Sequence, residues 1–217
     1  MVDFERARKA MVDNQLRTSN VVDRRVLSAM LTVPREQFVP AARQALAYVD
    51  TTHDLGHGRV LSAPAPFAKL LQLAEIQPTD AVLDLGAGSG YSTAVIAQLA
   101  HEVVGIESNE TLAAEARKAL ADAGVTNAEI VVSDLADVKP HASGFDVILL
   151  EGAVEEVPEG LFKLLRDGGR LVALIRRGPA AVANLFVKSD ETVNSRAEFN
   201  ASLPPLGVSQ KGEEFVF

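Results

Sequence analysis

The sequence predicts an α/β protein built on a doubly wound, mostly parallel sheet with helices on both faces. Two observations lead to this prediction. Short apolar segments alternate with helical segments from residue 81 to residue 177, and the apolar segments are apolar throughout rather than at every second position. Such uninterrupted strands are typical of parallel sheets that helices cover on both sides. At 217 residues the chain fits a single compact domain.

The first part of the chain lacks this alternation. We expect residues 1–75 to form a helical and loop extension that contributes the acceptor site and packs on a core of residues 76–217. Apolar residues at helical spacing predict helices over residues 3–17, 23–31 and 66–73.

Two segments of this extension are expected to be irregular. The segment VPREQFVP (residues 33–40) has a proline near each end, which predicts an extended or turning conformation. The segment YVDTTHDLGHGRVLSAPAPF (residues 48–67) has no clear periodicity and contains Gly56, Gly58 and Pro64. This composition predicts an ordered loop.

The core reads as strands separated by helices. The strand segments are residues 81–85, 102–107, 128–134, 145–153 and 170–177. The helical segments are residues 93–100, 110–124 and 158–169. After Gly178 the pattern predicts late strands, added antiparallel at the edge of the sheet, and the final EEFVF (residues 213–217) resembles one more.

Composition argues against several classes of function. The net charge of −8 provides no basic surface for a nucleic-acid backbone, and no apolar run reaches the roughly 18 residues of a membrane span. The chain has no cysteine and only four histidines, so we expect no metal site. The charged start carries no apolar signal segment, which predicts a cytoplasmic protein. The sequence does not indicate an oligomeric state.

The turn after the first core strand, DLGAGSGY (residues 84–91), is the candidate ligand site. A phosphate-binding P-loop needs a lysine after its last glycine, and this turn has none. A dinucleotide-binding turn needs a third glycine where this chain has Tyr91 or Thr93, depending on the starting glycine. Dinucleotide binding therefore remains only as a minor alternative.

The turn matches the pattern acid-x-Gly-x-Gly-x-Gly at Asp84, Gly86, Gly88 and Gly90. This pattern is the first motif of class I S-adenosylmethionine-dependent methyltransferases. S-adenosyl-L-methionine carries a sulfonium, an ammonium and a carboxylate but no phosphate, so its cradle needs bare backbone and an acid rather than a lysine. The sequence thus predicts a Rossmann-like methyltransferase core with this cofactor.

Two acids follow later strands at suitable places. Glu107 ends an apolar strand, where a nucleoside-binding fold places a carboxylate against the ribose hydroxyls. Asp134 ends the next strand, where this enzyme class places an acid or amide against the adenine amino group. The alternatives are a solvated charge for Glu107 and an ordinary turn residue for Asp134. The predicted cofactor residues are Asp84, Gly86, Ala87, Gly88, Ser89, Gly90, Glu107, Ser108, Ser133, Asp134, Leu135 and Glu151.

The residues before the glycine turn resemble the amino-terminal third of protein-L-isoaspartate O-methyltransferases. The matching pieces, in chain order, are Met11-Val12 with Gln15-Leu16, Val33-Pro34-Arg35-Glu36 with Phe38-Val39-Pro40, Ala47-Tyr48 with Asp50, and Gly56-His57-Gly58 running into Leu61-Ser62-Ala63-Pro64. Later matches are Gly86 to Tyr91, Phe145-Asp146 and Gly168-Gly169. The resemblance covers residues 8–175.

This resemblance implies a repair reaction on isoaspartyl-containing proteins or peptides. The family methylates the α-carboxylate of isoaspartyl residues, and the ester then collapses to a succinimide. It also implies that Ser62 lies beside the acceptor carboxylate, which makes Ser62 the candidate catalytic residue. A carboxylate with a pKa near 4 is already ionised at neutral pH, so orientation rather than a general base is needed. The alternative is that Ser62 only stabilises the turn before Pro64.

Some positions depart from the family pattern. Leu135 stands where the family has glycine, and the carboxy-terminal end differs from the family's usual one. Glu151, with Glu155 and Glu156 after it, is expected to place negative charge near the active-site rim and to repel an anionic acceptor. Residues that could offset this charge are Arg59, Lys69 and Arg176. A methyltransferase with another carboxylate acceptor, or a non-catalytic scaffold, therefore remain as alternatives.

Overall fold

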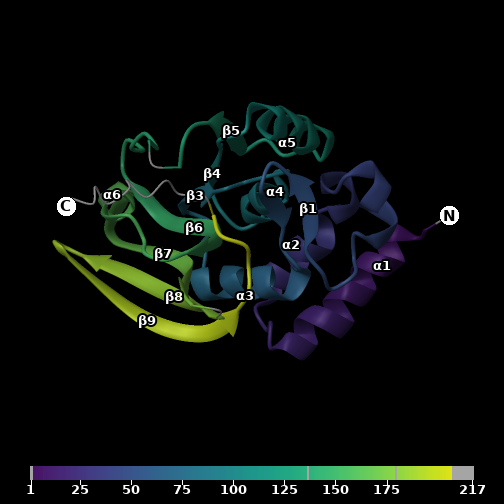
Figure 1. The fold of residues 1–217 in the computed structure, drawn as a ribbon, viewed down its shortest axis with the longest axis horizontal. Coiled ribbons are helices and arrows are strands. Elements are labelled where there is room, and N and C mark those ends of the chain that lie inside the picture. The colour runs from purple at the N-terminus through teal and green to yellow at the C-terminus, as the bar shows by residue number, and fades with distance from the viewer. Residues whose placement is uncertain (1, 136, 179, 207–217) are drawn as a thin grey trace, which may run out of the picture.

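A seven-stranded sheet forms the centre of the molecule, in the order β5-β4-β3-β6-β7-β8-β9 (Figure 1). The computed structural model describes residues 2–135, 137–178 and 180–206. The strands are β3 (Ala81–Leu85), β4 (Glu102–Glu107), β5 (Ala128–Val132), β6 (Phe145–Val154), β7 (Leu165–Arg177), β8 (Ala180–Ser189) and β9 (Thr192–Ala201). The five strands from β5 to β7 pair in parallel, while β8 and β9 are antiparallel. This confirms the predicted doubly wound sheet and the late edge strands.

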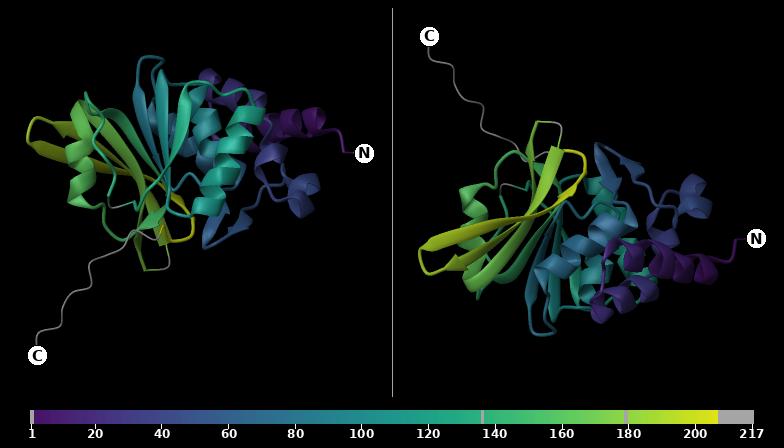
Figure 2. Two further views of the ribbon diagram at one scale, coloured as in Figure 1. Left: turned by 90° about the horizontal axis from the view of Figure 1, so that it is seen from above. Right: turned by 90° about the horizontal axis from the view of Figure 1, so that it is seen from below.

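Helices cover both faces of this sheet unequally (Figure 2). The helices beside the sheet are α3 (Pro64–Ala74), α4 (Tyr91–Ala97), α5 (Glu110–Asp122) and α6 (Glu159–Leu164). Helices α3, α4 and α5 pack in one apolar cluster with Val82 and Leu149 of the sheet. Helix α6 packs in a second cluster with Leu83 and Ile148. Successive strand residues therefore point to opposite faces, and both faces are apolar, as the uninterrupted strands predict.

The amino-terminal extension lies on the α4 side of the sheet. Its helices are α1 (Phe4–Met11) and α2 (Arg24–Thr32), joined by a π-helical turn at Val12–Leu16 and a short 3₁₀ turn at Arg17–Ser19. Asp3 and Asp23 cap these two helices by accepting hydrogen bonds from the backbone N–H groups of Arg6 and Arg25. The predicted helices therefore exist, and where one helix was expected over residues 3–17 an α-helix, a π-helical turn and a 3₁₀ turn follow one another over residues 4–19.

One prediction for the extension is wrong in detail. The expected loop at residues 48–67 contains a β-hairpin of β1 (His53–Gly56) and β2 (Arg59–Leu61). Left-handed backbone at Gly56, His57 and Gly58 reverses the chain in three residues, so the glycines form a tight turn rather than a long loop. The segment VPREQFVP folds into a 3₁₀ turn at Arg35–Phe38, in agreement with the turning conformation expected for it.

The predicted helix over residues 158–169 ends early. Helix α6 stops at Leu164, and Leu165 already has extended backbone and pairs with Phe145 of β6. Lys188 of β8 also donates a hydrogen bond to the Leu165 carbonyl. Pairing with β6, together with this hydrogen bond from the Lys188 side chain, thus outweighs the helical pattern of the sequence. The expected strand at residues 213–217 lies outside the described residues.

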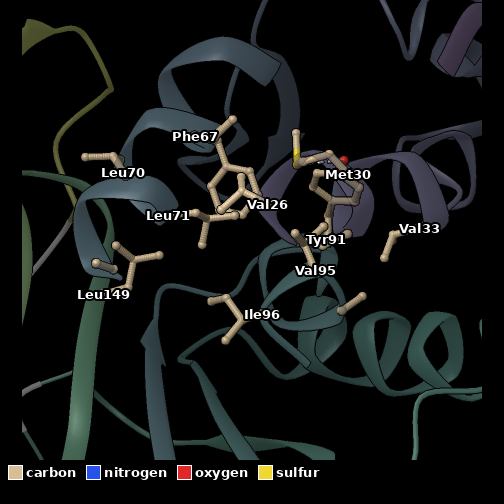
Figure 3. Close-up of a cluster of buried hydrophobic side chains, with 14 of the residues drawn as sticks. Val26, Met30, Val33, Phe67, Leu70, Leu71, Tyr91, Val95, Ile96 and Leu149 are labelled. Carbon is tan, nitrogen blue, oxygen red and sulfur yellow. Dashed lines mark hydrogen bonds between the residues drawn. The ribbon is translucent and has the colours of Figure 1, made fainter. Parts of the chain in front are cut away.

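One hydrophobic cluster joins the extension to the core (Figure 3). Met30 of α2 and Phe67 of α3 meet Tyr91 at the start of α4, and all three side chains are buried. The Tyr91 ring lies 5.6 Å from the ring of Phe38 and 5.9 Å from that of Phe67. Tyr91 therefore serves as a packing residue that both parts of the chain share.

Leu71→Ala should lower the free energy of unfolding by about 2–5 kcal/mol, because it opens a cavity in this shared cluster. Leu71 is 1% exposed. The matched control is Leu31→Ala on α2, where the leucine is 44% exposed, and its effect should stay near about 0.5 kcal/mol. Urea unfolding measures both. Equal losses in the two variants would contradict the shared core.

Candidate functional site

The glycine turn lies at the carboxyl end of β3, beside the point where the chain changes direction along the sheet. The chain proceeds from β3 outward through β4 to β5, then returns to β6 on the other side of β3. In open α/β sheets, ligands bind at such a point. The backbone N–H groups of Gly86 and Ala87 donate to the carbonyl of Ile106, which holds the turn against β4. Gly86, Gly88 and Gly90 all have positive φ, which glycine alone adopts readily.

Asp84, at the end of β3, binds the start of the helix that follows this turn. Its side chain is fully buried, and one oxygen accepts hydrogen bonds from Ser92 Oγ at 2.7 Å and Thr93 Oγ1 at 2.6 Å. The other oxygen, Oδ1, has no partner among the described residues. Burial raises the pKa of Asp84 to about 6, although the hydrogen bonds from Thr93 and Ser92 lower it. The charge of Glu107 adds to the rise.

Glu107 at the end of β4 is also fully buried. Its Oε1 accepts from the backbone N–H of Asn109 at 2.9 Å, and its Oε2 accepts from that of Gly88 at 3.0 Å. Arg59 Nε lies 3.2 Å from Oε1 and 3.1 Å from Oε2. A solvated strand-end charge is therefore excluded, and Glu107 lies directly at the glycine turn.

Ser62 follows β2 and is buried beside the same turn. Its carbonyl accepts a 2.6 Å hydrogen bond from Nη2 of Arg35, whose Nε donates to the Ala47 carbonyl at 2.8 Å. The Arg35 guanidinium has no exposed surface and lies over the Tyr91 ring, 4.8 Å from its centroid. Its Nη1 has no hydrogen-bond partner within the described part of the chain. Arg35 therefore fixes the Ser62 segment and keeps an unused donor there.

Ser62 and Arg35 share one small cavity with part of the glycine turn. Its volume is about 10 Å³, and its lining includes Arg35, Ser62, Gly86, Ser89 and Glu151. Among the described residues, the hydroxyl of Ser89 and the Oε1 atom of Glu151 lack hydrogen-bond partners. Because a buried acceptor without a donor is costly, these oxygens favour a ligand that brings positive charge or donors. The structure thus brings the predicted acceptor serine together with the predicted cofactor turn.

Glu151 differs from the exposed acid that the sequence suggested. Its carboxyl is buried, and burial together with the charge of Asp84 raises its pKa well above the usual range. Glu155 and Glu156 do not line this cavity. They line a separate groove of about 420 Å³ with Phe162 and Phe186, between α6 and the antiparallel strands.

Other predicted cofactor residues lie outside the cavity. Leu135 is buried in the apolar cluster on the α6 side. Asp134 is exposed, and the Ser133 hydroxyl donates to the Asp134 carbonyl at 3.1 Å. The Ser108 hydroxyl accepts from Arg59 Nη2 at 3.0 Å. Their proposed contacts with adenine and ribose remain predictions.

Lys69 and Arg176 do not offset the acids of the cavity. Lys69 Nζ lies 4.0 Å from the centroid of the Phe199 ring. Arg176 Nε donates to the Gly178 carbonyl. Of the basic residues expected to balance the charge, only Arg59 contacts the site, and Arg35 joins it although sequence reasoning gave Arg35 no role. Its position in a matched family segment was the available signal.

Two leucines lie against the glycine turn. A Cβ atom on Gly88 would lie 3.0 Å from Leu55 Cδ1 of the β1–β2 hairpin, and one on Gly86 would lie 2.5 Å from Leu206 Cδ1. Leu206 is held there because its N–H donates to the Ala153 carbonyl of β6 at 2.8 Å. No sequence signal indicated either contact.

The residues present fit a cationic nucleoside better than a phosphate ligand. The turn offers bare glycine backbone and no lysine, and two carboxylate oxygens beside it, Asp84 Oδ1 and Glu151 Oε1, have no hydrogen-bond partner within the described part of the chain. Residues 2–135, 137–178 and 180–206 contain no group of three His, Cys, Asp or Glu side chains suited to a metal ion. Within the same residues, none of the helices combines the length and apolar composition that a bilayer crossing requires.

Sequence comparison finds one family across nearly the whole chain. Residues 6–208 match the family model described as protein-L-isoaspartate(D-aspartate) O-methyltransferase. A protein-L-isoaspartate O-methyltransferase of Methanoculleus marisnigri is 40% identical over 180 residues, covering 83% of this chain and 81% of that relative. A relative of the same name from Opitutus terrae is 37% identical over 205 residues, covering 93% and 87%.

Structure comparison finds the same fold in solved structures. A candidate β-aspartate methyltransferase of Plasmodium falciparum, in complex with S-adenosyl-L-homocysteine, superposes with a TM-score of 0.80 at 22% identity, covering 93% of this chain and 99% of that one. A second structure, named protein-L-isoaspartate O-methyltransferase, superposes with a TM-score of 0.80 at 26% identity. The match covers 92% of this chain and 66% of that one. Both likenesses extend over the extension as well as the core.

Asp84→Asn should change how stability depends on pH. The pKa of Asp84 rises from 3.8 in the unfolded chain to about 6 in the folded protein, so the folded state binds more protons in that window. Titration of Asp84 therefore lowers the free energy of unfolding as the pH rises from about 4 to 6, and it lowers it no further above about pH 6. The free energy of unfolding of the variant, relative to wild type, should increase across this window.

Urea unfolding at pH 4 and pH 7 measures this difference. The control is Asp122→Asn, which removes an exposed carboxylate of α5 far from the cavity. This control should show no comparable gain between the two pH values. The same gain in both variants, or none for Asp84→Asn, would show that Asp84 does not titrate as described.

Proposed function

The chain belongs to the protein-L-isoaspartate(D-aspartate) O-methyltransferase family, and from this we propose how its own residues carry out the reaction. It is an S-adenosylmethionine-dependent carboxyl methyltransferase that acts on isoaspartyl residues of damaged proteins. The observation that supports our assignment of residues is the cavity that joins Ser62 to Gly86, Ser89 and Glu151. Residues 1–75 would contribute the acceptor side of this cavity and residues 76–217 the cofactor side.

The cofactor side uses the glycine turn and its two acids. Glu107 would accept hydrogen bonds from the ribose hydroxyls, and the bare backbone of Gly86 and Gly88 would allow the cofactor to approach closely. Asp84 holds the start of α4 through Ser92 and Thr93 and leaves Oδ1 for a positively charged group. S-adenosyl-L-methionine, when bound, supplies an electrophilic methyl group on a sulfonium.

The acceptor side uses Ser62 as an orienting donor. An isoaspartyl carboxylate is ionised at neutral pH, so the protein needs only to hold one oxygen and leave the other free to attack. Ser62 would donate to the held oxygen. Arg35, through the Ser62 carbonyl, keeps that segment in place and adds positive charge beside it. The raised pKa of Glu151 reduces the negative charge that an anionic acceptor meets.

A cytoplasmic location and the absence of a nucleic-acid partner follow from composition alone. They stay predictions, as does the role of Ser133, Asp134 and Leu135 at the adenine ring. Isoaspartyl proteins are the substrate class that the family name gives.

The test of the function is methyl transfer from labelled cofactor to two matched peptides. A peptide with one isoaspartyl residue should gain a base-labile, volatile label, and the same peptide with normal aspartate should not. Equal labelling of both peptides would favour a methyltransferase with another carboxylate acceptor. Cofactor binding without labelling of either would favour a non-catalytic scaffold.

Ser62→Ala should lower kcat/KM for the isoaspartyl peptide by about 10–100-fold, the range expected for one hydrogen bond to a charged group. The dissociation constant for S-adenosyl-L-homocysteine should stay within about twofold of wild type, because Ser62 faces the acceptor. Ser28→Ala, on the exposed side of α2, is the matched control and should change neither value. Unchanged kcat/KM in Ser62→Ala would leave only the turn-stabilising role.

A further inference from the structure

The carboxylate of Glu107 has no acceptor position left for a ribose. A carboxylate offers about four lone-pair positions, two on each oxygen. The Asn109 N–H uses one position on Oε1, and the Gly88 N–H uses one position on Oε2. The Arg59 Nε–H is shared between the two oxygens and occupies the remaining position on each. Because two ribose hydroxyls need two of these positions, one of the present donors has to leave before the cofactor can bind as proposed.

Arg59 is the donor that can leave. Gly88 and Asn109 donate through the backbone, at the turn itself and at the cap of α5. Arg59 reaches Glu107 by a side chain from the β1–β2 hairpin, whose two strands pair only with each other among the described strands. A two-stranded hairpin is marginally stable by itself, so it moves more easily than the central sheet.

The same hairpin covers the turn at a second point. Leu55 of β1 contacts Gly88, and Leu55, Val60 and Ser62 all line the cavity described above. Arg59 and Leu55 therefore block one ligand surface from one short element. A displacement of this element would clear Glu107 and Gly88 together.

A displaced Arg59 needs another anion. Its side chain is 10% exposed, and a largely buried cation without a partner is strongly unfavourable. Ser62 lies three residues after Arg59 on the same short segment, and the proposed acceptor beside Ser62 is a carboxylate. Charge-assisted hydrogen bonds between guanidinium and carboxylate are strong and directional.

We propose that Arg59 exchanges partners during the reaction cycle, holding Glu107 before the cofactor binds and the acceptor carboxylate afterwards. This proposal rests on the proposed function. It makes Arg59 a specificity-determining residue for an anionic acceptor, and it makes the cofactor bind first. Arg35 differs, because its Nε and Nη2 donate to backbone carbonyls, those of Ala47 and Ser62, and not to a carboxylate that the ribose needs.

The first experiment measures S-adenosyl-L-homocysteine binding by calorimetry in wild type and Arg59→Gln. Removal of the competing guanidinium should tighten binding at least fivefold. Arg17→Gln is the matched control, since it removes an exposed ion pair with Asp13 and should leave the dissociation constant unchanged. Unchanged or weaker binding in Arg59→Gln would overturn the exchange, because Arg59 would then not compete with the ribose.

The second experiment uses the wild-type protein and so does not depend on folding of the variant. Binding of an isoaspartyl peptide and of its α-carboxamide counterpart is measured with and without saturating S-adenosyl-L-homocysteine. The carboxylate peptide should bind at least tenfold more tightly when S-adenosyl-L-homocysteine is present. By linkage, the peptide should lower the dissociation constant of S-adenosyl-L-homocysteine by the same factor. The carboxamide should show no such effect. An equal effect on both peptides would overturn the exchange.

The outcomes separate this proposal from the function on which it rests. If wild type and Arg59→Gln bind S-adenosyl-L-homocysteine equally well, the exchange is wrong and the function stands. If neither protein binds it, the proposed cofactor role fails and the exchange is overturned with it.

Discussion

The buried carboxylate of Glu107 is the interaction on which the arrangement of the site depends. It ends β4, receives the N–H of Gly88 from the turn after β3, receives the N–H of Asn109 at the start of α5, and pairs with Arg59 of the hairpin. A buried charge is tolerated only when it is fully hydrogen-bonded. The chain satisfies that requirement by bringing four separate elements to one point. The same requirement makes the point sensitive to any ligand that competes for those oxygens.

Charge explains why the site has two sides. The proposed cofactor side gathers the carboxyl groups of Asp84, Glu107 and Glu151, which suit a cationic ligand and repel an anion. The proposed acceptor side contains the buried guanidinium of Arg35, and Arg59 binds Glu107 from the hairpin that leads into Ser62. A protein that binds a sulfonium cation beside a carboxylate anion needs groups of opposite charge a short distance apart. Burial moderates the acids, since it raises the pKa of Asp84 and Glu151 toward the neutral form.

The sequence predicted those parts of the fold that local pattern determines. The apolar runs gave the core strands, and the acid-glycine pattern located the turn and Asp84 beneath it. The errors arose where distant pairing overrides local preference, as at Leu165, which joins β6 instead of extending α6. The contacts of Arg35 and Arg59 could not be predicted, because their partners Ser62 and Glu107 lie 27 and 48 residues away. Periodicity carries no information about such contacts.

Leu206 closes the glycine turn from nearly the far end of the described chain, and this has a consequence for biosynthesis. The strands β3 to β6 leave the ribosome long before the residue that covers Gly86. During translation Gly86 therefore lacks this cover until residue 206 has been made, whereas Leu55, the leucine against Gly88, precedes the turn in the chain.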